Sequence, residues 1–122
     1  MSTPIVTIDQ VSKSYVSQGK ESLVLNNISF GIEKGEIISL LGKSGCGKST
    51  LLNCIGGFEP VNSGRILLDN QEVKKPSKRC VMLMQNYGLL PWRSVRKNVE
   101  LALESANLSK KEITTRANYY LE

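Results

Sequence analysis

The chain has 122 residues, a net charge of +5 and 40% apolar residues, the size and composition of one globular domain. Its longest nearly uninterrupted apolar run, residues 37–41, is far shorter than the roughly 20 residues of a membrane-spanning helix, and we expect no secretory signal at its N-terminus. Three cysteines at no metal-ligand spacing and the absence of histidine exclude zinc fingers and histidine-dependent catalysis. The basic charge alone favours a solvated surface, and we expect no nucleic-acid partner.

The first half of the chain predicts an antiparallel β layer followed by an α/β unit. Apolar residues alternate in 5–11 and in 23–32, the period of half-buried strands, with a polar turn at 16–21 between them. Residues 36–41 are apolar on both faces, which is typical of a central strand in a parallel sheet. A glycine-rich loop follows, and then residues 48–55 have apolar residues at helical spacing. The order of strand, glycine loop and helix indicates an α/β fold.

The second half predicts shorter elements. Two small strands are expected at 66–68 and 72–73, and residues 80–84 form a second fully apolar strand candidate. Beyond Pro91 the apolar spacing predicts a helix with Ser94 as its N-cap, and the capping box from Ser109 to Glu112 predicts the start of a last helix. The sequence ends at Glu122 while this pattern is still helical, so we expect the chain to be truncated there.

Residues 42–49 match the phosphate-binding P-loop pattern G-x-x-x-x-G-K-[ST]. Its glycines allow close backbone approach, and successive N–H groups at the start of the next helix receive phosphate oxygens. Lys48 brings a positive charge to the outer phosphates, and the Ser49 hydroxyl is an oxygen ligand of the kind that Mg²⁺ prefers. The predicted phosphate-binding residues are Gly42, Lys43, Ser44, Gly45, Cys46, Gly47, Lys48, Ser49 and Thr50.

Three features together resemble the N-terminal half of an ABC-transporter ATP-binding subunit: the loop at 42–50, the turn at 56–60 with Ser63-Gly64 after it, and Gln85 before residues 89–92. The segment 89–92 and the residues that follow it are most similar to the nitrate, sulfonate and taurine importer group. The resemblance implies an α/β fold with a P-loop NTPase-type sheet and an antiparallel β-subdomain, truncated before the signature motif and the catalytic Asp-Glu strand. Within 1–122, residues 3–93 would hold the β-subdomain and P-loop core, and residues 94–122 the start of a helical subdomain.

The same resemblance implies ATP and Mg²⁺ as ligands. Tyr15, 27 positions before Gly42, matches the aromatic residue that stacks on adenine; an ordinary strand tyrosine is the alternative. Gln85 matches the glutamine whose side chain reaches Mg²⁺ and the attacking water; a polar strand end is the alternative. Ser49 would be the other metal ligand.

The resemblance also implies partners and a location. The surface that receives a transmembrane permease subunit corresponds to Leu89, Leu90, Pro91 and Trp92, for which simple core packing is the alternative. In the full-length protein the ATP-binding subunits would form a homodimer, in the cytoplasm at the inner face of the cell membrane.

The chain departs from the family pattern in ways that limit its chemistry. It contains no Ser-Gly-Gly, no histidine and no acid that ends a four-residue apolar strand. We therefore assign no certain catalytic residue, keep Gln85 as a candidate for positioning water or Mg²⁺, and expect no useful hydrolysis by these residues alone. Two alternatives stay open: a non-catalytic fragment that binds nucleotide or only a membrane subunit, and a small P-loop kinase or GTPase, although the Asn-Lys-X-Asp guanine motif is absent.

Overall fold

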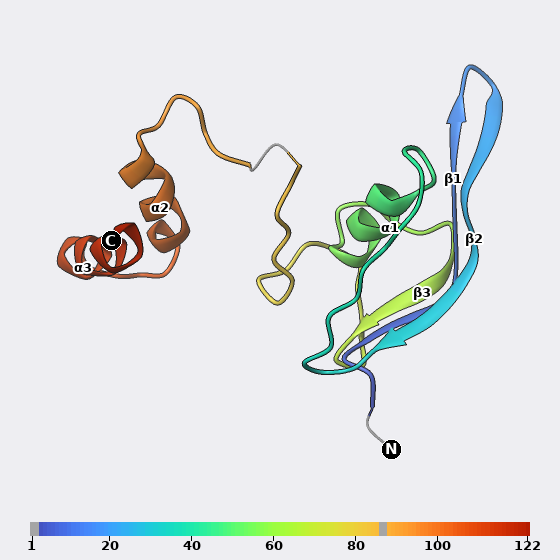
Figure 1. Cartoon of the computed structure of the whole chain (residues 1–122), viewed down its shortest axis with the longest axis horizontal. Helices are drawn as coiled ribbons and strands as arrows, with labels where there is room; N and C mark the ends of the chain where they lie inside the picture. The colour runs from blue at the N-terminus through green and yellow to red at the C-terminus, as the bar shows by residue number, and fades with distance from the viewer. Residues whose placement is uncertain (1–2, 86–87) are drawn as a thin grey trace. The chain divides into compact units, whose positions relative to one another are not determined.

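The computed structural model describes residues 3–85 and 88–122, which fall into two compact units divided between Met82 and Leu83. Figure 1 shows a sheet and the helix α1 in the first unit, and the helices α2 and α3 in the second. The expected division into a part up to residue 93 and a helical part from residue 94 stays a prediction.

A long antiparallel hairpin dominates the first unit. Its strands are β1 (Val6–Ser17) and β2 (Lys20–Ile32), so the predicted alternation in 5–11 and 23–32 is confirmed. The polar stretch expected as a turn is mostly strand, because its residues pair across the hairpin up to Ser17 opposite Lys20. Only Gln18 and Gly19 form the turn, both with positive φ, which suits the twist of a two-residue hairpin loop.

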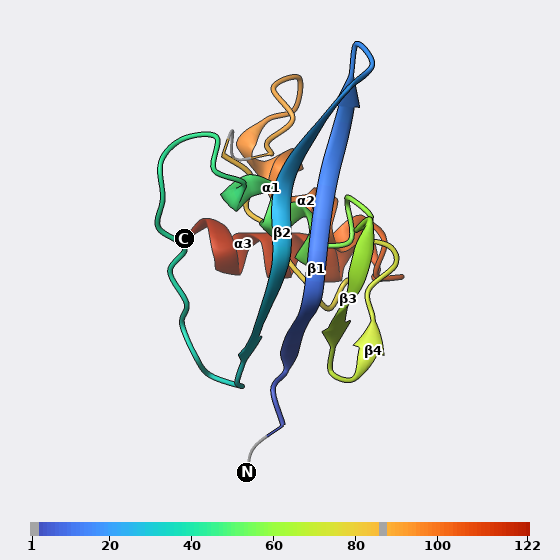
Figure 2. The ribbon, with the colours of Figure 1, turned by 90° about the vertical axis from the view of Figure 1, so that its right-hand side faces the viewer.

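Two short strands extend the sheet on the other side of β1. β3 (Ser63–Leu68) pairs antiparallel with β1, and β4 (Gln71–Glu72) pairs with β3, which gives the order β2-β1-β3-β4. Figure 2 shows these strands side by side. The two small predicted strands are thus confirmed.

The helix α1 (Lys48–Ile55) covers one face of this sheet, as its apolar spacing predicts. Its residues Leu51 and Cys54 are buried against three of the strands. The buried core of the unit consists of Ile8, Val11, Leu25, Leu51, Cys54 and Ile66. The core therefore joins the helix that follows the glycine loop to the strands before and after it.

Two predicted strands did not form. Residues 36–41 and 80–84 have no regular secondary structure, and Ile37 and Leu41 are 94% and 92% exposed. A strand of a parallel sheet is stabilised by hydrogen bonds to neighbouring strands and by helices on both faces. The described residues contribute no such neighbour to either segment, so the prediction of strands at these positions is wrong for this structure.

The second unit is a pair of helices, α2 (Val95–Glu104) and α3 (Lys110–Leu121), and both predicted helices are confirmed. The Ser94 side chain accepts a hydrogen bond from the Lys97 N–H, and Ser109 and Glu112 form the expected capping box. Arg96 on α2 donates to the Asn118 side chain on α3 at 2.7 Å. Within the ranges that the structure describes, no helix has the length and hydropathy to cross a membrane.

Candidate functional site

The P-loop residues form the connection that leads into α1. The Cys46 N–H donates to the Lys43 carbonyl oxygen at 3.2 Å, and Gly45 and Gly47 have φ of +81° and +103°, a region that favours glycine. A Cβ added to Gly47 would lie only 3.0 to 3.2 Å from atoms of Val24 and Leu25. The glycine at position 47 therefore allows both the turn of the loop and its close approach to β2.

The N-terminus of α1 is open for an anion. Gly47 is its N-cap residue and has no side chain to accept a hydrogen bond from the first turn. The first N–H groups of a helix lack partners inside the helix and carry partial positive charge. Because Ser49 and residues 42–46 are exposed, these donors lie where a phosphate can reach them.

The Lys48 side chain closes back over the loop. Its ammonium donates to the carbonyl oxygen of Gly42, so the first and last parts of the motif are joined by one hydrogen bond. The positive charge is therefore held at the start of the loop, where its partner is a neutral carbonyl. A phosphate oxygen would give the ammonium a charge-assisted hydrogen bond, which is roughly twice as strong as a neutral one.

The structure gathers residues 42–50 in one loop and helix start, and it places Tyr15 in the same unit, on β1. The Tyr15 side chain is 37% exposed, so part of the ring is open to a ligand. Gln85 is exposed and belongs to the second unit. Its contact with Mg²⁺ or water stays a prediction.

Lys13, two residues before Tyr15, was missed by the sequence analysis. It is 7% exposed, and its ammonium lies 3.6 Å from the Glu59 carboxylate and 5.2 Å from the centre of the Tyr15 ring. A lysine among polar strand residues gives no signal of burial. The one hint in the sequence was Glu59, an acid shortly after the helix and its glycine turn, which could serve as the partner of a buried lysine.

The segment 89–92 in the second unit has an ordered backbone and exposed apolar side chains. The Asn98 side chain accepts from the Leu90 N–H at 2.8 Å and donates to the carbonyl oxygens of Leu90 and Arg93 at 3.2 and 3.1 Å. Trp92 is 77% exposed. A cavity of about 340 Å³ is lined by Leu89, Leu90, Pro91, Arg93, Val95, Asn98 and Val99.

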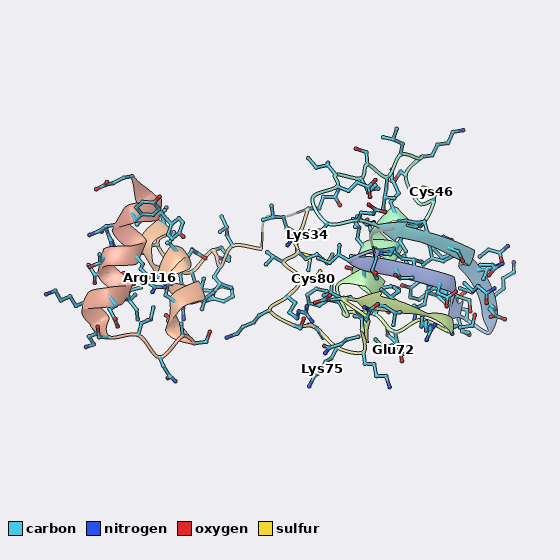
Figure 3. All side chains as sticks on the ribbon, turned by 90° about the horizontal axis from the view of Figure 1, so that it is seen from below. Lys34, Cys46, Glu72, Lys75, Cys80 and Arg116 are labelled. Carbon is cyan, nitrogen blue, oxygen red and sulfur yellow. The ribbon has the colours of Figure 1, made fainter. Side chains whose placement is uncertain are left out.

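A further cavity of about 500 Å³ lies in the first unit, between the end of α1 and the β3–β4 edge. Its lining includes Glu72, Lys75 and Cys80. Figure 3 shows Glu72 and Lys75 on the opposite side of the unit from Cys46 of the P-loop. Cavity size alone would favour this place for a ligand, but a phosphate needs an array of N–H donors, and these lie at the loop.

Known proteins resemble this chain in sequence over most of its length. Residues 25–121 match the family model described as ABC transporter. The chain is 36% identical over 124 aligned residues to the nitrate import ATP-binding protein NrtD of Synechococcus elongatus, covering 100% of this chain and 45% of that protein. It is 37% identical to the taurine import ATP-binding protein TauB of Pseudomonas aeruginosa, covering 96% of this chain and 44% of that protein.

A solved structure shows the same fold. The ATP-binding cassette MJ0796, in a dimeric post-hydrolysis state bound to ADP and Pi, matches with a TM-score of 0.81 and 28% identity. The match covers 93% of this chain and 54% of that one. The chain thus spans about half the length of these relatives, and its α/β fold is that of ATP-binding cassettes.

Proposed function

The chain belongs to the ABC transporter family, and from this premise we propose that residues 42–50 bind the phosphates of ATP together with Mg²⁺. The observation that carries the proposal is the arrangement around Lys48, whose ammonium donates to the Gly42 carbonyl oxygen at the start of the loop that ends in the uncapped N-terminus of α1. Backbone N–H groups, the helix dipole and one lysine charge then act on the same anion. Family membership decides against the kinase or GTPase alternative.

The residues present fit a magnesium ion that arrives with the nucleotide. Ser49, in the first turn of α1, has an exposed side chain, and a hydroxyl oxygen is a ligand that Mg²⁺ accepts beside phosphate oxygens and water. Bound there, the ion would neutralise part of the phosphate charge. Gln85 belongs to the other unit, and its role in positioning Mg²⁺ or water stays a candidate assignment from the family resemblance.

We also propose that Tyr15 stacks on the adenine. The ring is partly open and comes from the same unit as the P-loop. Stacking on an aromatic ring is worth about 1–3 kcal/mol per base and tolerates different bases. Tyr15 would therefore add affinity with little discrimination between nucleotides.

Within a whole transporter, we propose that this chain is part of the ATP-binding subunit of an importer for substrates such as nitrate, sulfonates or taurine. The names of NrtD and TauB support this class. The segment 89–92 would dock a transmembrane permease subunit, since Leu89 and Trp92 are exposed and Leu89, Leu90 and Pro91 line a cavity of about 340 Å³. The subunit would act as a homodimer at the cytoplasmic face of the membrane.

Docking on the permease is tested with Trp92→Ala in a pull-down with the cognate permease in detergent. Trp92 is 77% exposed, so its removal leaves the fold intact, and we expect permease capture to fall while ATP binding is unchanged. Equal capture of both proteins would contradict this use of the segment.

Nucleotide binding is tested by calorimetry with Mg-ATP after circular dichroism has shown that the chain and its variants are folded. Loss of a charge-assisted hydrogen bond of about 1.5–3 kcal/mol predicts that Lys48→Ala binds ATP roughly ten- to a hundredfold more weakly. Lys34→Ala is the matched control, because Lys34 is an exposed lysine in the turn after β2. Equal affinity of the parent and Lys48→Ala would overturn the proposed site.

A further inference from the structure

Lys13 is the only buried charged side chain among the residues that the structure describes. Burying an ammonium is unfavourable unless an opposite charge or another partner compensates for its lost hydration. Its two neighbours are the Glu59 carboxylate at 3.6 Å and the face of the Tyr15 ring, with 5.2 Å from Nζ to the ring centre. One ammonium therefore joins a residue that follows the P-loop helix to the aromatic ring on β1.

A bulge in β1 puts Lys13 in this position. Gln10 has φ of +50°, and the pairing of β1 with β2 shifts between Ile8 and Val11. Because a bulge inserts one extra residue, it moves the following side chains to the opposite face. Ile8 and Val11 are therefore both in the core, and Lys13 and then Tyr15 continue on that same face.

Two hydrogen bonds, one of them to a side chain, hold this part of β1 against the segment that follows α1. The Asn62 N–H donates to the Ser12 carbonyl oxygen at 3.0 Å, and the Ser14 N–H donates to the Asn62 side-chain oxygen at 2.8 Å. These bonds lie on either side of Lys13 in the chain. We call this group of contacts, made by residues 12–14 with Glu59 and Asn62, the β1 clamp.

The charge of Lys13 also acts at the end of the P-loop helix. Burial raises the pKa of the Cys54 thiol in the last turn of α1, and the Lys13 ammonium opposes that rise while the Glu59 carboxylate adds to it. Both charges are thus close enough to α1 to affect a thiol on it. The N-terminal end of α1 follows the P-loop, where Gly47 lies close to Val24 and Leu25 of β2.

We propose that Lys13 is a positioning residue for nucleotide recognition, which holds the Tyr15 ring in a fixed place relative to the P-loop helix. The inference rests on the proposed function, in which Tyr15 stacks on the base. Lys13 binds one face of the ring through a cation–π contact and anchors it, through Glu59, to the segment that ends α1. The opposite face is left for the base, and the phosphates do not depend on this lysine.

The test uses calorimetry on the whole chain with two ligands, Mg-ATP and Mg-tripolyphosphate, which has the phosphates but no base. Tyr15→Ala should weaken ATP binding about five- to a hundredfold, and Lys13→Met about three- to tenfold. Neither change should affect tripolyphosphate. The double variant should bind ATP no more weakly than Tyr15→Ala alone, because both changes remove one interaction.

Two further variants distinguish a specific effect on base recognition from a general loss of folded protein. Glu59→Gln removes the anchoring charge from a partly exposed side chain and should weaken ATP binding in the same direction, again without effect on tripolyphosphate. Lys20→Met, on an exposed lysine of the same hairpin, is the matched control and should bind both ligands as the parent does.

The outcomes separate the inference from the function on which it rests. Equal weakening of both ligands by Lys13→Met and by Glu59→Gln would show a merely structural role and overturn the inference, as would unchanged ATP binding in both. If Tyr15→Ala leaves ATP binding unchanged, base stacking is wrong and the inference falls with it. If Lys48→Ala does not weaken tripolyphosphate, the phosphate site itself is wrong.

Discussion

Replacement of Gly47 by alanine tests how the loop is held in place. Gly47 has φ of +103°, and the left-handed region costs an alanine about 1–2 kcal/mol. Its new Cβ would also lie 3.0 Å from a Val24 methyl and 3.1 Å from the Val24 carbonyl oxygen. Overpacking of this kind typically costs about 1–3 kcal/mol, so Gly47→Ala should lower the free energy of unfolding by roughly 2–5 kcal/mol.

Gly45→Ala is the matched variant in the same loop. Gly45 has φ of +81°, but no described atom lies within 4 Å of a Cβ added there. Gly45→Ala should therefore lower the free energy of unfolding only by the cost of the left-handed backbone, about 1–2 kcal/mol. Urea unfolding followed by circular dichroism measures both variants, and the difference between them isolates the contact with β2.

The expected order is a larger loss for Gly47→Ala than for Gly45→Ala. Equal losses would refute the reasoning, because the close approach of the loop to β2 would then have no energetic consequence. For ATP, Gly47→Ala should also bind more weakly than Gly45→Ala, since the N–H groups at the start of α1 would have to move away from β2.

Three other properties can be checked directly. Cys46 is exposed, whereas Cys54 is buried and its thiol pKa is raised. Iodoacetamide should therefore label Cys46 first, as measured by mass spectrometry, and Mg-ATP should slow that labelling. Rapid labelling of Cys54 would contradict the packing of α1. Hydrogen bonds from the Ser109 backbone and side chain hold the pKa of Glu112 below its usual value. The cap therefore stabilises α3 fully at pH values above the usual carboxyl pKa, and this stabilisation is lost as the pH falls through the lowered pKa of Glu112. Circular dichroism should show that loss of helix on acidification in the parent, and Glu112→Gln should lack the pH-dependent part. Phosphate release from ATP should equal that of the Lys48→Ala blank, because a site without a positioned base binds without accelerating the reaction; Lys48-dependent turnover near 1 s⁻¹, the low end of ordinary enzymes, would contradict this.

Local patterns predicted the elements whose stability is local. The alternation in 5–11 and 23–32 gave the hairpin, and the capping box at Ser109 gave the start of α3. The segments 36–41 and 80–84 have the composition of buried strands, yet they are irregular in the structure. A parallel strand depends on neighbours that are distant in the sequence, and its composition cannot show whether they are present.

The P-loop can be assigned from the sequence because each of its residue types has one physical task at a fixed spacing, and phosphate binding there stays a prediction. The burial of Lys13 was not, because it depends on the bulge at Gln10, which changes the face of every later residue in β1. Strand alternation assumes a period of two without interruption. Binding residues beyond a bulge are therefore assigned to the wrong face when only the sequence is considered.

Phosphate binding by the backbone of residues 42–50 is tested most directly by nuclear magnetic resonance of the ¹⁵N-labelled chain titrated with Mg-ATP and with Mg-tripolyphosphate. We predict that both ligands shift the amide signals of residues 44–50 most strongly, and that only ATP also shifts those around Tyr15. Amide shifts confined to the residues that line the 500 Å³ cavity, among them Glu72, Lys75 and Cys80, or no shifts at all in a folded chain, would contradict the proposed site.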